Sequence, residues 1–155
     1  MIYFDHSATT PMHPRVAEKV DYINRTHYAN PSSVYSKGRK AKSLIEKARN
    51  QVADAIGAES NQILFTSGGT EANNQVLWNK LSEEKKHLIV SSIEHPAILK
   101  VLNKIEPYGI TSSFTPVNKY GIVEIDSVMN LINENTGLIS IMLANNEVGS
   151  IQPIQ

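Results

Sequence analysis

The sequence has no cysteine. It can therefore form no disulfide, no thiolate zinc site and no iron–sulfur cluster on its own thiolates, and it offers no cysteine nucleophile. An excess of one charge is also missing, because 15 Lys and Arg residues balance 15 Asp and Glu residues. This balance argues against a nucleic-acid-binding or membrane-surface protein that relies on bulk positive charge. The sequence has no apolar run of about 18 residues and no basic, apolar leader at its start, so we expect a cytoplasmic protein.

Along the sequence, short apolar runs alternate with segments in which apolar residues recur at helical spacing. The 155 residues, 41% of them hydrophobic, suffice for one compact domain with its own core. Helices are predicted from Pro14, over about 36–56 up to Gly57, after the glycines at 68–69, from Pro96 and over 125–132. The predicted strands are 63–66, 87–92, 111–115 and 138–144. Strands buried on both faces and separated by helices predict an α/β fold, a doubly wound and mainly parallel sheet preceded by a helical segment.

A glycine pair follows the first predicted strand. In an open parallel sheet, ligands bind beyond the carboxyl ends of the strands. In Ser67-Gly68-Gly69-Thr70, the glycines would let backbone N–H groups approach an anion, and the following helix would add its positive end. This pattern indicates a phosphate cradle, with Thr70 as a further donor. The alternative is a tight turn in which Thr70 is simply the N-cap.

Two more polar segments follow predicted strands at the same edge. His95 stands before Pro96, which keeps it out of the helical region, so its ring could stack on a flat ligand or move a proton; otherwise it only starts a helix. Asn145 and Asn146 follow the last strand and could bind a ligand oxygen or shape an Asx turn. Each signal is weak alone, but the three occur at the same end of three strands.

Taken in order, these motifs resemble a known family. The series is Tyr3-Phe4-Asp5-His6-Ser7-Ala8-Thr9-Thr10-Pro11, Asn30-Pro31-Ser32-Ser33, Phe65-Thr66-Ser67-Gly68-Gly69-Thr70-Glu71, Glu94-His95 and Asn145-Asn146-Glu147-Val148-Gly149. It resembles the N-terminal part of cysteine desulfurases of the NifS/IscS group, among the class-V aminotransferases that use pyridoxal 5′-phosphate. The resemblance implies the type I fold of these enzymes, with about 1–15 as an N-terminal arm and 16–155 as an incomplete large cofactor-binding domain.

The resemblance also implies roles for single residues. The cofactor phosphate would lie against Gly69 and Thr70, the ring of His95 would stack on the pyridine ring and help to move protons, and Asn146 would bind the phenolic oxygen. The implied reaction removes sulfur from L-cysteine, leaving alanine and an enzyme persulfide for iron–sulfur clusters or tRNA thiolation. The implied partners are a sulfur-acceptor or scaffold protein and a second copy in a homodimer, with no metal, nucleic acid or membrane.

The family's Schiff-base lysine and sulfur-accepting cysteine lie farther along than the segment that this sequence matches. We therefore expect a truncated chain that is inactive alone, with an unpaired sheet edge and exposed apolar surface. Tyr35 and Leu143 also stand where the family often has histidine. The alternatives are a fragment of another class-V enzyme, such as a selenocysteine lyase or an aminotransferase, and a non-catalytic remnant or module that pairs with a full-length desulfurase.

Overall fold

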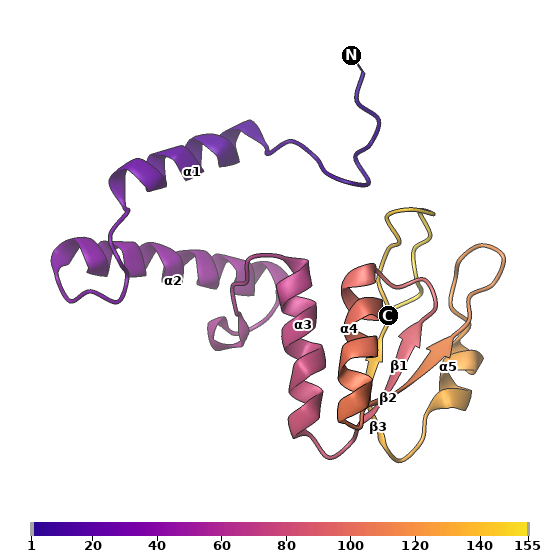
Figure 1. Cartoon of the computed structure of the whole chain (residues 1–155). Helices are drawn as coiled ribbons and strands as arrows, with labels where there is room; N and C mark the ends of the chain where they lie inside the picture. Colours follow the sequence, from indigo (N-terminus) through magenta and orange to yellow (C-terminus); the bar gives the residue numbers. More distant parts are fainter. Residues whose placement is uncertain (1, 155) are drawn as a thin grey trace. The chain divides into compact units, whose positions relative to one another are not determined.

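The computed structural model describes residues 2–154, which form two compact units that meet in the sequence between Phe65 and Thr66 (Figure 1). The first unit is helical. Its helix α1 (Pro14–Thr26) begins at Pro14, as the sequence predicts, and α2 (Ser36–Ile56) ends at Gly57, whose φ of 69° is left-handed. The helix α1 buries no residue, and α2 buries only Gly38, Ala41 and Ala53, so this unit has almost no core of its own.

The motif Asn30-Pro31-Ser32-Ser33 forms the turn that packs on α2. The Asn30 side chain accepts a hydrogen bond from the Ser32 N–H at 2.9 Å, and the Ser33 N–H donates to the Asn30 carbonyl at 3.1 Å. A Cβ on Gly38 would come within 2.5 Å of the Ser33 carbonyl oxygen. Glycine is therefore required at position 38 so that the helix and the turn can approach this closely.

The predicted strand at 63–66 is wrong. A short 3₁₀ helix, η1 (Ser60–Gln62), precedes these residues, which run irregularly, and Leu64 is 69% exposed. The Ile63 carbonyl accepts a hydrogen bond from Arg49 at 2.6 Å, and the Arg49 guanidinium lies 5.0 Å from the centre of the Phe65 ring. The apolar run thus rests against α2 instead of pairing with a strand.

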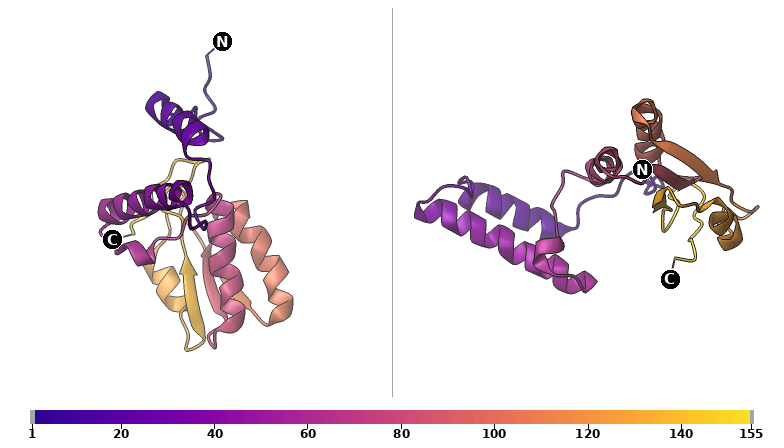
Figure 2. Two further views of the ribbon diagram at one scale, coloured as in Figure 1. Left: turned by 90° about the vertical axis from the view of Figure 1, so that its left-hand side faces the viewer. Right: turned by 90° about the horizontal axis from the view of Figure 1, so that it is seen from below.

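The second unit is a three-stranded parallel sheet with helices on both faces. Its order is β2-β1-β3, so that β1 (His87–Ser91) lies between β2 (Thr111–Thr115) and β3 (Thr136–Ser140). The helices are α3 (Gly69–Asn79), α4 (Pro96–Ile105) and α5 (Ile125–Leu131), with the 3₁₀ turns η2 (Lys80–Ser82) and η3 (Glu106–Tyr108). The right-hand view of Figure 2 looks along the layers of this unit. The predicted α/β architecture is confirmed.

The central strand β1 is buried on both faces. Leu88 and Val90 pack with Leu77 of α3 and Leu102 of α4, whereas Ile89 packs on the opposite side with Val128 of α5. At the start of the strand, the ring of His87 contacts the hydroxyls of Thr136 and Ser113 at 2.8 and 2.9 Å. These contacts connect the first residue of β1 to both neighbouring strands.

The predicted strand at 138–144 is wrong in extent and in burial. The strand β3 ends at Ser140, and beyond it Ala144 makes only an isolated antiparallel bridge with Ile151. Because β3 is an edge strand with β1 as its one neighbour in residues 2–154, Ile139 is 42% exposed. A continuous apolar run predicts burial on both faces, but the described chain supplies covering side chains for only part of this strand.

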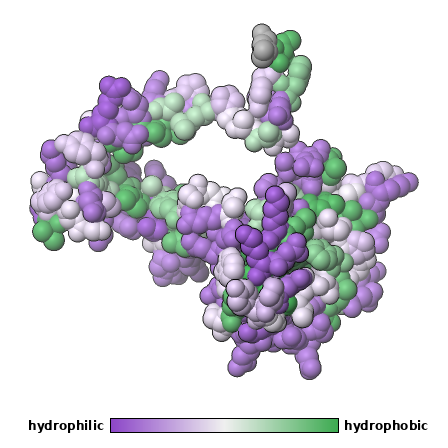
Figure 3. All heavy atoms as spheres, viewed as in Figure 1, coloured by the Kyte–Doolittle hydropathy of each residue, from purple (hydrophilic) through white to green (hydrophobic). Residues whose placement is uncertain are grey.

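Apolar grooves border β3 on both faces. They are lined by two sets that share Ile139 and Ile141: Val123, Ile125, Val128, Met129, Gln152, Pro153 and Ile154 on one face, and Asn73, Val76, Leu77, Ile98, Leu138 and Ser140 on the other. Figure 3 shows apolar side chains at the surface of both units. Within residues 2–154, no helix is both long and apolar enough to cross a membrane.

We predict that the chain self-associates through the β3 edge and that Ile139→Lys weakens this association. An exposed edge strand with apolar flanks favours pairing between molecules, and a lysine opposes it. Sedimentation should show an association constant about tenfold lower, a change of about 1.4 kcal/mol. The matched control is Phe114→Lys on β2, the other edge strand. An equal effect of the two substitutions would contradict the prediction.

Candidate functional site

The candidate site lies at the carboxyl ends of the strands. Only four residues separate the end of β1 from the start of α4, so the N-terminus of α4 is at this edge of the sheet. The helix α3 ends shortly before β1 begins, and it runs antiparallel to the strand on the same face as α4. The two helix N-termini therefore lie at the same edge, as Figure 1 shows.

The glycine pair lies at the N-terminus of α3. Gly68 is the N-cap of α3, Gly69 is its first residue, and Thr70 is its second. The alternative with Thr70 as the N-cap is therefore wrong. Neither glycine has a left-handed φ, and a Cβ built on either would meet no atom within 4 Å. The fold itself does not require glycine at 68 and 69, and the open space beside the helix N-terminus suits an anion.

Glu71 fixes the turn that leads into α3. Its carboxylate accepts hydrogen bonds from the Ser67 hydroxyl at 2.7 Å and from the Ser67 N–H at 2.6 Å. These two bonds, above all the one from the hydroxyl, hold the pKa of Glu71 below its ordinary value. Within residues 2–154, the Thr70 hydroxyl has no hydrogen-bond partner and stays available to a ligand.

His95 is the N-cap of α4. Its φ of −61° and ψ of 146° are extended, as the following proline predicts, and its Nδ1 accepts the Ala97 N–H at 3.1 Å. The accepting Nδ1 carries no proton, which assigns the neutral ring's proton to Nε2. The sequence left open whether His95 starts a helix or faces a ligand. The structure is consistent with both roles, because the residue caps α4 and its exposed ring presents a flat face and one N–H.

The two asparagines after β3 have separate tasks. Asn145 is buried, and its Oδ1 accepts the N–H groups of Glu147 and Val148 at 2.8 and 2.9 Å, which is an Asx turn. Its Nδ2 donates to the Ile93 carbonyl at 2.9 Å. Asn146 is exposed and lines a pocket. Of the two roles that the residue pattern left open for this pair, the turn belongs to Asn145, and Asn146 is the exposed member of the pair at the pocket.

His95 and Asn146 line the same pocket. It has a volume of about 280 Å³, and it is formed by residues 92–96 after β1 and 145–148 after β3. Gly69 and Thr70 do not line this pocket; they lie at the N-terminus of the neighbouring helix α3. The structure therefore brings two of the four predicted residues directly together and places the other two at the same edge of the sheet.

Two functional candidates were missed by sequence reasoning. Glu94 is buried beside His95, and its carboxylate accepts hydrogen bonds from the Ser91 hydroxyl and the Met142 N–H. Asn145, which also connects the two loops, looked interchangeable with Asn146. Their common signal is a polar residue directly before a predicted site residue, but sequence alone does not show that the two loops meet.

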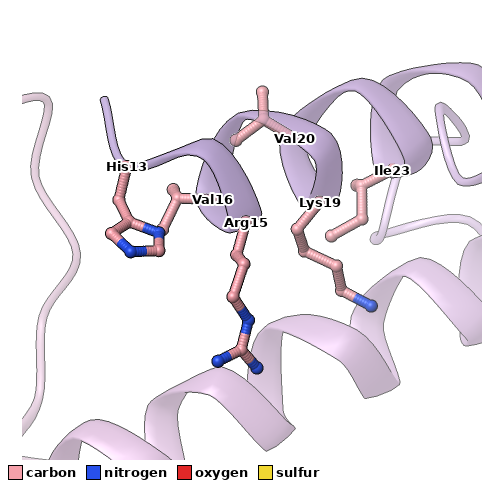
Figure 4. Close-up of a pocket in the computed structure, with 6 residues that line it drawn as sticks. All are labelled: His13, Arg15, Val16, Lys19, Val20 and Ile23. Carbon is pink, nitrogen blue, oxygen red and sulfur yellow. The ribbon is translucent and has the colours of Figure 1, made fainter. Parts of the chain in front are cut away.

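A second hollow lies in the first unit, on α1 (Figure 4). It is lined by His13, Arg15, Val16, Lys19, Val20 and Ile23. None of the predicted site residues is among them, and they come from one exposed helix and its N-cap. Within residues 2–154, no group of three or more His, Asp or Glu side chains is arranged to hold a metal ion.

Comparisons with known proteins agree with the motif series. The family model described as aminotransferase class-V matches residues 2–155. A cysteine desulfurase IscS from Methanosarcina thermophila is 45% identical over 99% of this chain. The chain spans only about two fifths of such curated relatives, 39% of that one and 40% of a similar desulfurase from Dictyoglomus turgidum.

Solved structures show the same fold. A NifS-like protein superposes on 98% of this chain with a TM-score of 0.93 and 38% identity, and the match covers 43% of that protein's chain. The structure of SspA in complex with cysteine matches 97% of this chain and 44% of its own, with a TM-score of 0.88 and 38% identity.

We predict that Gly69→Ala leaves the free energy of unfolding unchanged or slightly raised while it weakens binding of pyridoxal 5′-phosphate about tenfold. The added methyl group meets nothing in the chain, but it occupies space that a phosphate needs. Equilibrium dialysis measures the affinity, and thermal unfolding measures the stability. Pyridoxal, which lacks the phosphate, serves as the control ligand and should bind both variants equally. Undiminished affinity for the phosphate ester would rule out the cradle.

We predict that His95→Asn keeps α4 intact but weakens binding of the same ligand. Asparagine is a good N-cap, so the free energy of unfolding should change by less than about 0.5 kcal/mol, whereas the flat ring and its Nε2 are lost. An affinity about tenfold lower is expected in the same dialysis measurement. His95→Phe is the converse variant, because it keeps a ring but loses the cap and should cost about 1 kcal/mol of stability. Wild-type affinity of the asparagine variant would exclude stacking.

Proposed function

The chain belongs to the class-V aminotransferase family, and from this premise we propose that it carries the cofactor-binding part of a cysteine desulfurase. The observation that carries the proposal is the pocket shared by His95 and Asn146 at the carboxyl edge of the sheet. The names of the relatives and the cysteine complex of SspA support cysteine as the substrate class. The residues fit pyridoxal 5′-phosphate, a flat ring with one phosphate and one phenolic oxygen.

Each residue has a task that follows from its geometry. The N-terminus of α3, with Gly69 and the Thr70 hydroxyl, binds the phosphate through N–H and O–H donors and the positive helix end. His95 stacks on the ring of the ligand, and because its Nδ1 is bonded to Ala97, it moves a proton only at Nε2. The Asn146 amide binds the phenolic oxygen. The bound cofactor supplies an electron sink for reactions at the substrate's α- and β-carbons.

The sulfur-accepting thiol comes from outside these 155 residues, because they include no cysteine. In the proposed reaction, the Cβ–S bond of L-cysteine breaks, the sulfur passes to that thiol as a persulfide, and alanine is left. The proposal includes a sulfur-acceptor or scaffold protein, a homodimer of the complete enzyme, and a cytoplasmic location, where thiols stay reduced. It also treats residues 1–15 as an arm and 16–155 as part of the large cofactor-binding domain.

We predict that the 155-residue chain alone, given pyridoxal 5′-phosphate, L-cysteine and a thiol reductant, releases neither alanine nor sulfide. Adding the complementary C-terminal portion of a relative, such as the Methanosarcina thermophila desulfurase, should yield both products in equal amounts. Amino-acid chromatography and a sulfide assay measure them, and the complementary portion alone is the control.

Three outcomes separate the possibilities. Turnover by the pair supports the proposal, and the products formed from selenocysteine or other amino acids distinguish a lyase or an aminotransferase. A stable pair that binds the cofactor but turns nothing over favours a non-catalytic module. A folded pair that binds no pyridoxal 5′-phosphate contradicts the proposal.

A further inference from the structure

Beyond the carboxyl ends of β1 and β3, the two chain segments are joined by side-chain hydrogen bonds and no longer by the backbone hydrogen bonds of the sheet. The last registered pair is Val90 with Ser140. Beyond it, in the part of the chain that the structure describes, no backbone–backbone hydrogen bond joins residues 92–96 to residues 141–148. Two side chains make the connection instead: the Glu94 carboxylate accepts the Met142 N–H, and the Asn145 amide donates to the Ile93 carbonyl. We call this pair of contacts the loop bridge.

The loop bridge is buried, whereas its neighbours are exposed. Glu94 is 7% exposed and Asn145 is 9% exposed. The next residue in each loop, His95 or Asn146, is exposed and lines the pocket. All four residues line the pocket, and each loop therefore pairs one buried residue that contacts the other loop with one exposed residue.

We infer that Glu94 and Asn145 are positioning residues that fix His95 and Asn146 relative to each other across the pocket. This inference rests on the proposed function, in which His95 and Asn146 contact the same ligand ring. A ring held between two loops is bound well only if the loops keep their spacing before the ligand arrives. Because the backbone hydrogen bonds of the sheet no longer set the spacing between these loops, the buried side chains of Glu94 and Asn145 set it.

Asn145 does two things that one substitution can separate. Its Oδ1 holds the Asx turn at Glu147 and Val148, and its Nδ2 holds the other loop at Ile93. Asn145→Asp keeps oxygen acceptors for the turn, but it loses the donor and faces a carbonyl with a carboxylate. The turn should therefore remain while the bridge opens, because an acceptor left unpaired in a buried position is costly.

The test compares two ligands on the 155-residue chain. We expect Asn145→Asp to weaken binding of pyridoxal 5′-phosphate about tenfold, while the affinity for inorganic phosphate, bound at the N-terminus of α3, stays unchanged. A merely destabilised protein would lose both. Asn103→Asp, the same chemical change at an exposed position of α4, should alter neither affinity. The inference is overturned if Asn145→Asp weakens the binding of both ligands equally, or if it weakens the binding of neither.

A second measurement needs no ligand. In the NMR spectrum of the free chain, Asn145→Asp should shift the His95 ring signals, although residue 95 is fifty residues away in the sequence, and Asn103→Asp should not. Glu94→Gln, with Glu84→Gln as its exposed control, repeats both tests if the first variant fails to fold. Unmoved His95 signals overturn the inference, even if the chain binds no pyridoxal 5′-phosphate. The absence of cofactor binding by wild type and variants, with the His95 shifts present, counts against the proposed function alone.

Discussion

The parallel alignment of β1 with its two neighbours is the constraint on which the second unit depends. Parallel strands end at one edge, so the loops that follow β1 and β3 meet there. The apolar side chains of β1 are covered by α3 and α4 on one face and by α5 on the other, which holds the strand in place. The polar groups of the candidate site follow strands or begin helices at this edge, so the parallel arrangement of the strands decides where these groups lie.

The site separates positioning from contact at adjacent residues. Among the residues that line the pocket, Glu94 and Asn145 are buried and join the loops, whereas His95 and Asn146 are exposed. His95 is itself held by its hydrogen bond with Ala97, which fixes which ring nitrogen carries the proton. A site built in this way is ordered before any ligand binds, so less binding free energy is lost in ordering it.

The two units differ in how much of their stability they supply themselves. The second unit has a continuous core on both faces of β1, whereas the first unit buries mainly small residues of α2. Apolar side chains along α1 and beside β3 remain at the surface. Relatives about two and a half times as long carry additional chain, and the grooves beside β3 are the places in the second unit where additional apolar surface could be buried.

The sequence by itself determined the helices at Pro14, Ser36, Gly69, Pro96 and Ile125, because helix starts, periodicity and stops are local. It also determined the family, through motifs spaced along the whole chain. Local pattern failed at 63–66 and 138–144, since whether an apolar run becomes a buried strand depends on distant segments that pair with it. Only the tertiary structure decided that Asn145 forms the turn and that Glu94 reaches Met142. Those distinctions depend on contacts between segments about fifty residues apart, which no local spacing encodes.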